Sequence, residues 1–147
     1  GWQSSDFCVN NEYDPLHSFL INCLAGFPVI QESFNIKIDA WVNINKPGDC
    51  NIKHNHPGVD LAGVLWIKCP ENCGVIEFSS PTVFQSHTQI ISYTEDFKNQ
   101  NNLFHSYYFN PTEGRILVFP AHLDHYVKEN KSNEDRISVS FNIRLSK

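Results

Sequence analysis

The sequence lacks methionine altogether and begins with Gly1-Trp2. Because a natural reading frame starts with Met, we expect the natural protein to carry further residues before Gly1. No apolar run approaches the roughly 20 residues that cross a membrane, and no signal-peptide pattern is present. These absences predict a cytoplasmic protein without a membrane span.

A basic tract is also missing. The 11 Lys and Arg residues stand against 16 Asp and Glu residues, which gives a net charge of −5 at pH 7. Proteins bind nucleic acid largely by neutralising phosphates with Lys and Arg. An acidic chain without a basic cluster is therefore disfavoured as a nucleic-acid-binding protein.

Paired cysteine motifs are absent as well. The five cysteines are odd in number and show no C-x-x-C spacing. Cys69 and Cys73 lie four residues apart, without further zinc-ligand partners beside them. The pattern favours reduced thiols in a cytoplasmic protein over a disulfide framework or a zinc site.

The chain does contain enough apolar material for a folded core. Its 147 residues are 41% hydrophobic and 13% aromatic, with 11 Phe. A chain of this length buries roughly 68–70% of its unfolded surface, and this composition argues against disorder. We predict a single domain over 1–147, with a helical N-terminal part over about 1–35 and a β core over about 36–147.

One helix is expected near the N-terminus, over residues 15–25. Asp14 suits the N-cap, Pro15 suits the first helical position, and Gly26 suits the C-terminal stop. The sequence therefore predicts one helix before the strands begin.

Beyond residue 35 the pattern changes to short β-branched and aromatic runs separated by turns. The predicted strands cover residues 36–45, 61–69, 75–78, 89–93, 104–109, 115–119, 125–128 and 136–145. The polar segment 95–103, with three Asn, is predicted to be a loop. Many short strands with one early helix predict a mainly β sandwich or jelly roll, with the helix packed outside.

The last predicted strand alternates polar and apolar residues over ten positions. Because successive side chains of a strand point to opposite faces, its polar residues share one face: Arg136, Ser138, Ser140, Asn142 and Arg144. Asn43 and Asn45 share a face of an earlier strand in the same way. Such faces either meet solvent on a half-exposed sheet or line the mouth of a barrel where a ligand binds.

Histidines help to choose between these two interpretations. His54 and His56 are two residues apart, so in an extended segment both rings point the same way and can reach one metal ion. His125 opens the penultimate strand, and Arg136 follows 11 residues later, after a polar turn. A hairpin there would place Arg136 beside His125, where a guanidinium can clamp a carboxylate with two hydrogen bonds. An ordinary surface pair is the alternative for His54 and His56.

The remaining histidines are weaker candidates. His122 lies near His125 and competes with it for the role of third ligand, but His125 begins the strand. His17, His87 and His105 have no partners at metal-ligand spacing and suit ordinary surface or core positions.

The order of these residues resembles the motif series of the iron(II)/2-oxoglutarate-dependent oxygenases. Several stretches resemble, more narrowly, the small oxygenases of that superfamily found in bacteria and marine phages. These stretches are Gly1-Trp2-Gln3-Ser4, residues 41–49, His54-Asn55-His56-Pro57, residues 114–120 and residues 136–142. The resemblance implies a double-stranded β-helix, which is a cupin-like jelly roll, that uses iron(II), 2-oxoglutarate and molecular oxygen.

The resemblance also implies roles for individual residues. His54 and His125 match iron ligands, and His56 falls where the usual carboxylate of the H-x-D motif stands. Arg136 matches the partner of the distal carboxylate of 2-oxoglutarate, with Ser138 beside it. Asn43, Asn45 and Asn142 are possible pocket residues, and residues 85–103 are a candidate lid or substrate loop.

Two positions depart from the usual pattern. The common iron site holds two His and one carboxylate, whereas His56 would make three neutral ligands. Asp60, four residues further on, is the alternative carboxylate, and we favour His56 because the i+2 spacing keeps it on one strand face. Trp66 stands where related enzymes often have Tyr, and its indole N–H donates one hydrogen bond but accepts none.

The predicted function is oxidative decarboxylation of 2-oxoglutarate coupled to hydroxylation of an organic substrate. One alternative is a cupin-type metal dioxygenase or isomerase that uses three His and no 2-oxoglutarate. The other is a non-catalytic jelly-roll binding module in which the histidines are incidental.

Overall fold

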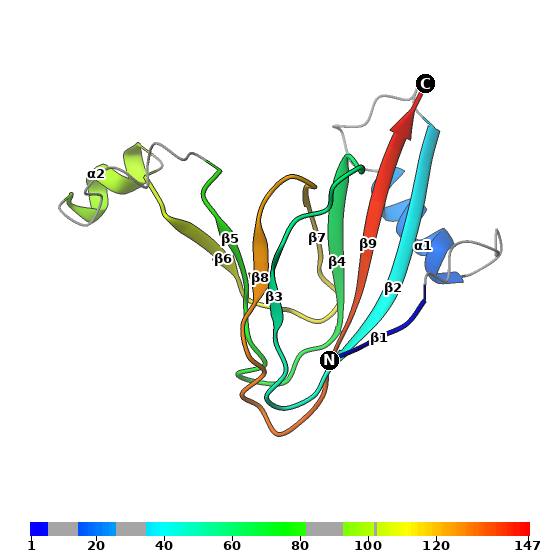
Figure 1. Cartoon of the computed structure of the whole chain (residues 1–147), viewed down its shortest axis with the longest axis horizontal. Coiled ribbons are helices and arrows are strands. Elements are labelled where there is room, and N and C mark those ends of the chain that lie inside the picture. The colour runs from blue at the N-terminus through cyan, green and yellow to red at the C-terminus, as the bar shows by residue number, and fades with distance from the viewer. Residues whose placement is uncertain (6–14, 26–34, 82–92, 102) are drawn as a thin grey trace.

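The computed structural model describes residues 1–5, 15–25, 35–81, 93–101 and 103–147. Strands dominate this part of the chain, and two helices accompany them (Figure 1). The elements are β1 (Trp2–Gln3), α1 (Pro15–Ala25), β2 (Asn35–Asn45), β3 (Asn51–His54), β4 (Leu61–Lys68), β5 (Ile76–Ser79), α2 (Glu95–Gln100), β6 (Ser106–Phe109), β7 (Ile116–Pro120), β8 (His125–Val127) and β9 (Arg136–Ser146). None of the described helices is both long and apolar enough to span a membrane.

The strands form two antiparallel sheets. One sheet has the order β1-β2-β9-β4-β7, and the other has the order β3-β8-β5-β6. From β2 onward, successive strands are shared between the two sheets in the order of a double-stranded β-helix, as the resemblance implied. Figure 1 shows the smaller sheet facing one side of the larger sheet and α1 lying on the other side.

The larger sheet buries both of its faces. Leu20 and Leu24 of α1 pack against Val139, Phe141 and Ile143 of β9, which forms the outer core. Because α1 lies on the face away from the smaller sheet, the prediction of a helix packed outside the β core is confirmed. Its predicted caps, at residues 14 and 26, lie outside the described residues.

The inner core lies between the two sheets. Its buried members are Ala62, Val64, Trp66, Ile76, Phe78 and Phe119. Gly63 of β4 lies directly against the Phe141 ring, where a β-carbon would collide with that ring. Glycine at this position therefore lets β4 approach β9 closely.

Register places the predicted polar residues side by side. In the pairing of β2 with β9, Asn43 is opposite Ser138 and Asn45 is opposite Arg136. In the pairing of β4 with β9, Trp66 is opposite Ser138. One polar strip therefore runs across β2 and β9 on the face that meets the smaller sheet, with the Trp66 indole of β4 beside it.

The structure corrects three sequence-based expectations. Residues 95–100 form the short helix α2, not a loop, and the Thr94 hydroxyl caps it by accepting a hydrogen bond from the Phe97 N–H. Residues 51–54 form the strand β3, which was not predicted. β8 and β9 belong to different sheets, so Arg136 does not lie on the strand next to His125. The strand predicted over 89–93 falls almost entirely outside the described residues.

The third correction has a physical cause in the segment between β8 and β9. Asn130 in this segment is fully buried, and its side-chain amide donates to the Asn45 carbonyl at 2.9 Å and the Glu134 carbonyl at 2.8 Å. Its backbone N–H also donates to the Asp49 carbonyl at 2.9 Å. These bonds anchor the segment to the end of β2 and to the turn after it, and β9 begins there, with Arg136 opposite Asn45.

Candidate functional site

Three histidines converge at one end of the smaller sheet. His54 ends β3, His125 begins β8, and these two residues are direct partners in the antiparallel ladder. His56 follows two residues beyond the end of β3, and its Nε2 lies 3.4 Å from the Nε2 of His125. One nitrogen of each ring lies within 4.8 Å of the others, which is close enough for a single metal ion to bind all three.

Hydrogen bonds fix the orientation of two of these rings. The Nδ1 atom of His54 lies 2.7 Å from the Ile52 carbonyl, and that of His125 lies 2.9 Å from the Leu123 carbonyl. A carbonyl can only accept, so each Nδ1 carries a proton, and Nε2 is the nitrogen that can bind a metal when the ring is neutral. Metal-binding histidines are commonly oriented by such backbone carbonyls.

His56 is held from different directions. Its ring stacks on Trp41 at 6.2 Å between centroids and lies parallel to the His125 ring at 5.1 Å. Its backbone N–H donates to the Ala121 carbonyl at 2.9 Å. His56 lies beyond the end of β3, so the expected shared strand face does not account for its position beside His54.

Asn142 is the polar side chain that accompanies His56. Burial first, and the neighbouring His54 second, lower the pKa of His56, and hydrogen bonding with Asn142 opposes them. The Asn142 Oδ1 is buried and has no well-aligned hydrogen bond to any described residue. The amide oxygen is thus placed to accept from the His56 ring after a small adjustment.

His125 is held in its neutral form. Its side chain is 4% exposed, and the rings of Phe78 and Phe119 pack against it at 5.6 and 4.8 Å between centroids. Burial is the main reason that the pKa of His125 falls to about 4, with the other two histidines adding to the effect. Only neutral imidazole can donate a lone pair to a metal, so this ring is ready to bind one at pH 7.

Arg136 lies across the lumen from these histidines. It is 3% exposed, and its Nη1 donates to the Cys73 carbonyl at 2.8 Å and more weakly to the Gly74 carbonyl at 3.4 Å. Gly74 has a φ of +88°, and a β-carbon there would collide with the Lys128 carbonyl, so glycine is required for this turn. Within the described part of the chain, Arg136 forms no salt bridge with a carboxylate.

A single small cavity, with a volume of about 50 Å³, borders both groups, and we call it the polar cavity after the arginine, histidine and asparagine side chains in its lining. Arg136, His54 and His56 all line it, and so do the candidate residues Asn43, Asn45, Trp66 and Ser138. Its amides form local networks: Asn43 donates to the Ser140 hydroxyl at 2.8 Å, and Asn45 donates to the Asn51 side chain at 2.9 Å. The face predicted to line a barrel therefore borders an internal cavity.

Other candidates lie elsewhere. One carboxylate oxygen of Asp60 accepts from the Leu145 N–H at 2.8 Å, and Asp60 is not among the grouped metal-ligand side chains. His122 and His105 are exposed, and His17 lies half-buried in α1. His87 and the rest of residues 85–92 of the candidate lid 85–103 fall outside the described residues, while the described part of that stretch contains α2.

Sequence reasoning missed two kinds of contributors. Trp41 had a usable signal, because it alternates with Asn43 and Asn45 and so shares their face. The carbonyls of Cys73 and Gly74 that hold Arg136 had none, because a backbone oxygen is available at every position.

Comparison with known proteins agrees with this geometry. A family model described as "Putative 2OG-Fe(II) oxygenase" matches residues 39–142. The match covers both histidine segments and Arg136. The chain therefore belongs to this family, whose members use iron(II) and 2-oxoglutarate. No curated protein matches the sequence.

Solved structures of low sequence identity share the fold. A 2OG-Fe(II) oxygenase family oxidoreductase from Burkholderia pseudomallei is 13% identical, with a TM-score of 0.58 over 87% of this chain and 58% of that one. A prolyl-4-hydroxylase from Pseudomonas putida is 14% identical, with a TM-score of 0.53 over 88% of this chain and 62% of that one. The carbocyclase SnoK of nogalamycin biosynthesis is 9% identical, with a TM-score of 0.52 over 74% of this chain and 49% of that one. The chain thus spans less than two thirds of each of these relatives.

Proposed function

We propose that the chain is an active oxygenase in which His54, His56 and His125 bind iron(II) and Arg136 binds the distal carboxylate of 2-oxoglutarate. The observation that carries the proposal is a buried arginine without a carboxylate partner, which lines the same cavity as the histidines. A buried charge is costly unless it is paired. A dicarboxylate would supply that missing partner.

The donor set suits the metal. Three neutral imidazoles leave the full double charge of iron(II) uncompensated, and Arg136 adds another positive charge to the same cavity. Because 2-oxoglutarate is a dianion, this positive field favours its binding. When bound, iron(II) supplies the redox chemistry that couples dioxygen to the oxidation of 2-oxoglutarate and of a second substrate.

The residues around Arg136 position the cosubstrate. Ser138 lies on the same face of β9, and its hydroxyl can donate to the carboxylate that Arg136 binds. The Trp66 indole N–H is a second donor from the adjacent strand. Asn43 and Asn45 are tied into amide networks, so their part is to keep the cavity wall in place.

The reaction that we propose is hydroxylation. One oxygen atom of dioxygen enters succinate as 2-oxoglutarate loses carbon dioxide, and the other enters a C–H bond of the substrate. Epimerisation or ring closure begins from the same binding of 2-oxoglutarate, so the part played by Arg136 does not depend on the final product.

Succinate formation tests this proposal. Protein supplied with iron(II), 2-oxoglutarate, oxygen and ascorbate should release succinate slowly even without a substrate. Arg136→Gln should abolish that release, whereas Arg144→Gln, on the same strand face but exposed, should retain it. Metal binding without any binding of 2-oxoglutarate would instead support a three-His metal dioxygenase of the cupin type.

We also propose a reducing compartment, such as the cytoplasm. The four described cysteines, Cys23, Cys50, Cys69 and Cys73, are free thiols. A reducing environment keeps cysteine thiols from forming disulfides, and it also keeps iron in the iron(II) state.

A further inference from the structure

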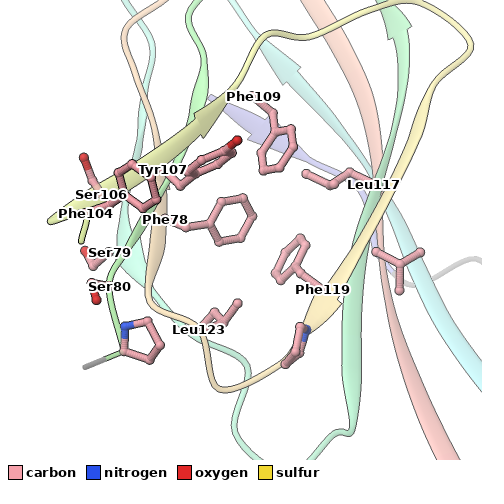
Figure 2. A pocket seen from close by; sticks show the side chains of 13 residues that line it. Phe78, Ser79, Ser80, Phe104, Ser106, Tyr107, Phe109, Leu117, Phe119 and Leu123 are labelled. Atoms are coloured by element: carbon pink, nitrogen blue, oxygen red, sulfur yellow. The ribbon is translucent and has the colours of Figure 1, made fainter. Parts of the chain in front are cut away.

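A second, apolar cavity opens beside the metal site. It has a volume of about 430 Å³ and lies between β6, at the edge of the smaller sheet, and β7, at the edge of the larger one. Figure 2 shows Phe78, Tyr107 and Phe109 projecting into it from one side and Leu117 and Phe119 from the other. A volume in this range is typical of small-molecule pockets.

The lining defines the chemistry of a ligand. Its side chains are aromatic, aliphatic, proline or serine, and none of the described lining residues is Asp, Glu, Lys, Arg or His. Phe78 meets Phe109 and Phe119 edge to face, at 6.0 and 4.8 Å between centroids. Transfer of an ionic group into such surroundings is unfavourable, so the cavity suits a neutral aromatic or aliphatic group. Ser79 and Tyr107, which also line it, carry hydroxyl groups that can bond to a polar substituent.

The cavity and the metal site share a wall. Phe78 and Phe119 line the cavity and also pack against the His125 ring. Phe119 lines the polar cavity of the histidines as well. Leu123 lines the apolar cavity, and its carbonyl orients the His125 Nδ1. A ligand in the apolar cavity is therefore one layer of side chains away from a metal-binding ring.

We propose that this cavity binds the neutral, apolar part of the organic substrate, with aromatic rings favoured. The inference rests on the proposed oxygenase function and adds a substrate class to it. The cavity shares a wall with His125 but is not lined by Arg136, so the apolar part of a substrate can lie next to the metal site without displacing 2-oxoglutarate from Arg136.

Indole serves as the probe, because it is neutral, aromatic and small enough for the cavity. Methyl NMR spectra of the full 147-residue chain, loaded with zinc(II) as a diamagnetic metal, would be recorded as indole is added. We expect saturable shifts at the methyl groups of Leu117, Val118 and Leu123, and none at Leu20 or Leu24 in the outer core. The anion phenylacetate should bind at least about tenfold more weakly than indole.

Two neighbouring tyrosines provide a matched pair of variants. Tyr107 lines the cavity, whereas Tyr108 does not, and both are more than half exposed, at 54% and 61%. Tyr107→Ala should weaken indole binding by about fivefold, because one aromatic contact is lost, and Tyr108→Ala should leave it unchanged. Circular dichroism would verify that both variants fold.

The outcomes separate this inference from the proposed function. Absence of saturable shifts, shifts centred on Leu20 and Leu24, equal binding of phenylacetate, or equal effects of the two tyrosine variants would each overturn the inference. Metal-dependent binding of 2-oxoglutarate is measured on the same sample. Its loss would overturn the proposed function, whatever the result with indole.

Discussion

The two faces of strand β9 carry buried side chains of opposite character. On the outer face, Val139, Phe141 and Ile143 pack under α1 and are almost completely buried in apolar contacts. On the inner face of the same strand, Arg136 and Ser138 are also buried, yet they line a polar cavity. Alternation along a single strand therefore separates stability from ligand binding.

This difference suggests that the outer face contributes mainly to stability and the inner face mainly to ligand binding. Apolar burial on the outer face supplies a non-directional contribution to folding. The inner face holds a buried arginine and several buried amides, and such groups cost free energy unless each finds a partner. Changes to the outer face should thus alter stability, and changes to the inner face should alter metal and anion binding.

The largest effect is expected on the outer face. Leu20→Ala removes a fully buried side chain of α1 and should lower the free energy of unfolding by about 2–5 kcal/mol. Urea unfolding measures this change, with Phe19→Ala, at a 45% exposed position of the same helix, as the control. The metal affinity of the folded variant should match that of the wild type. A parallel loss of metal affinity would mean that the two faces are not independent.

Proton uptake should affect the histidine site, which faces the inner side of the larger sheet from β3 and β8, strongly. The pKa of His125 is about 4 in the folded protein and near 6.5 in an unfolded chain. Between these values the unfolded state binds more protons, so the metal-free protein should lose stability as the pH falls from about 6.5 to 4, by up to about 3 kcal/mol. The pKa of Glu77 is lowered to about 2, so protonation of this carboxylate reduces the free energy of unfolding only below about pH 4.5.

Urea unfolding of the metal-free protein at pH 7, 6 and 5 measures this dependence. His125→Ala should have a flatter profile than the wild type over that interval. An unchanged slope in this variant would show that His125 is not the group responsible.

Removal of a metal ligand should lower the metal affinity without unfolding the protein. His125→Ala deletes one of three ligands and should weaken metal binding by about 100-fold or more, since loss of even an outer-shell partner typically costs 10–100-fold. Isothermal titration calorimetry with manganese(II) measures the affinity. His122→Ala and Asp60→Ala are the controls, because neither residue belongs to the histidine cluster. A large loss in Asp60→Ala would assign it the role that we give to His56.

The smallest effect is expected at Asn142, which positions His56 and is not proposed to touch the metal. Asn142→Ala should weaken metal binding by about tenfold, because His56 loses the side chain that opposes the lowering of its pKa. Asn142→Asp, which keeps an acceptor oxygen, should restore most of the affinity. If both variants bind manganese(II) like the wild type, Asn142 does not orient His56.

Much of the architecture was predictable because periodicity survives folding. The two-residue alternation of 136–145 and 36–45 identified both the strands and the residues that share the inner face. Pro15 marked the start of α1 correctly. These features depend on contacts along one element, which a sequence displays directly.

The remaining features depend on contacts between distant segments. The spacing of His54 and His56 is visible in the sequence, but β3 ends at His54, and a hydrogen bond from the His56 N–H to the distant Ala121 carbonyl helps to hold His56 in place. The segment between β8 and β9 is held by Asn130, which binds a carbonyl 85 residues away, at Asn45. Neither interaction leaves a local pattern in the sequence.

The central claim is that the space between the two sheets holds a metal and 2-oxoglutarate together, the metal at the histidines of the smaller sheet and 2-oxoglutarate at Arg136 of the larger sheet. Calorimetric titration of 2-oxoglutarate into the anaerobic protein tests it most directly, with and without iron(II), in the wild type, Arg136→Gln and Arg144→Gln. We expect tight binding only with iron(II), a loss of about 100-fold in Arg136→Gln, and no change in Arg144→Gln. Equal affinity in Arg136→Gln and the wild type, or equal affinity with and without iron(II), would contradict the account.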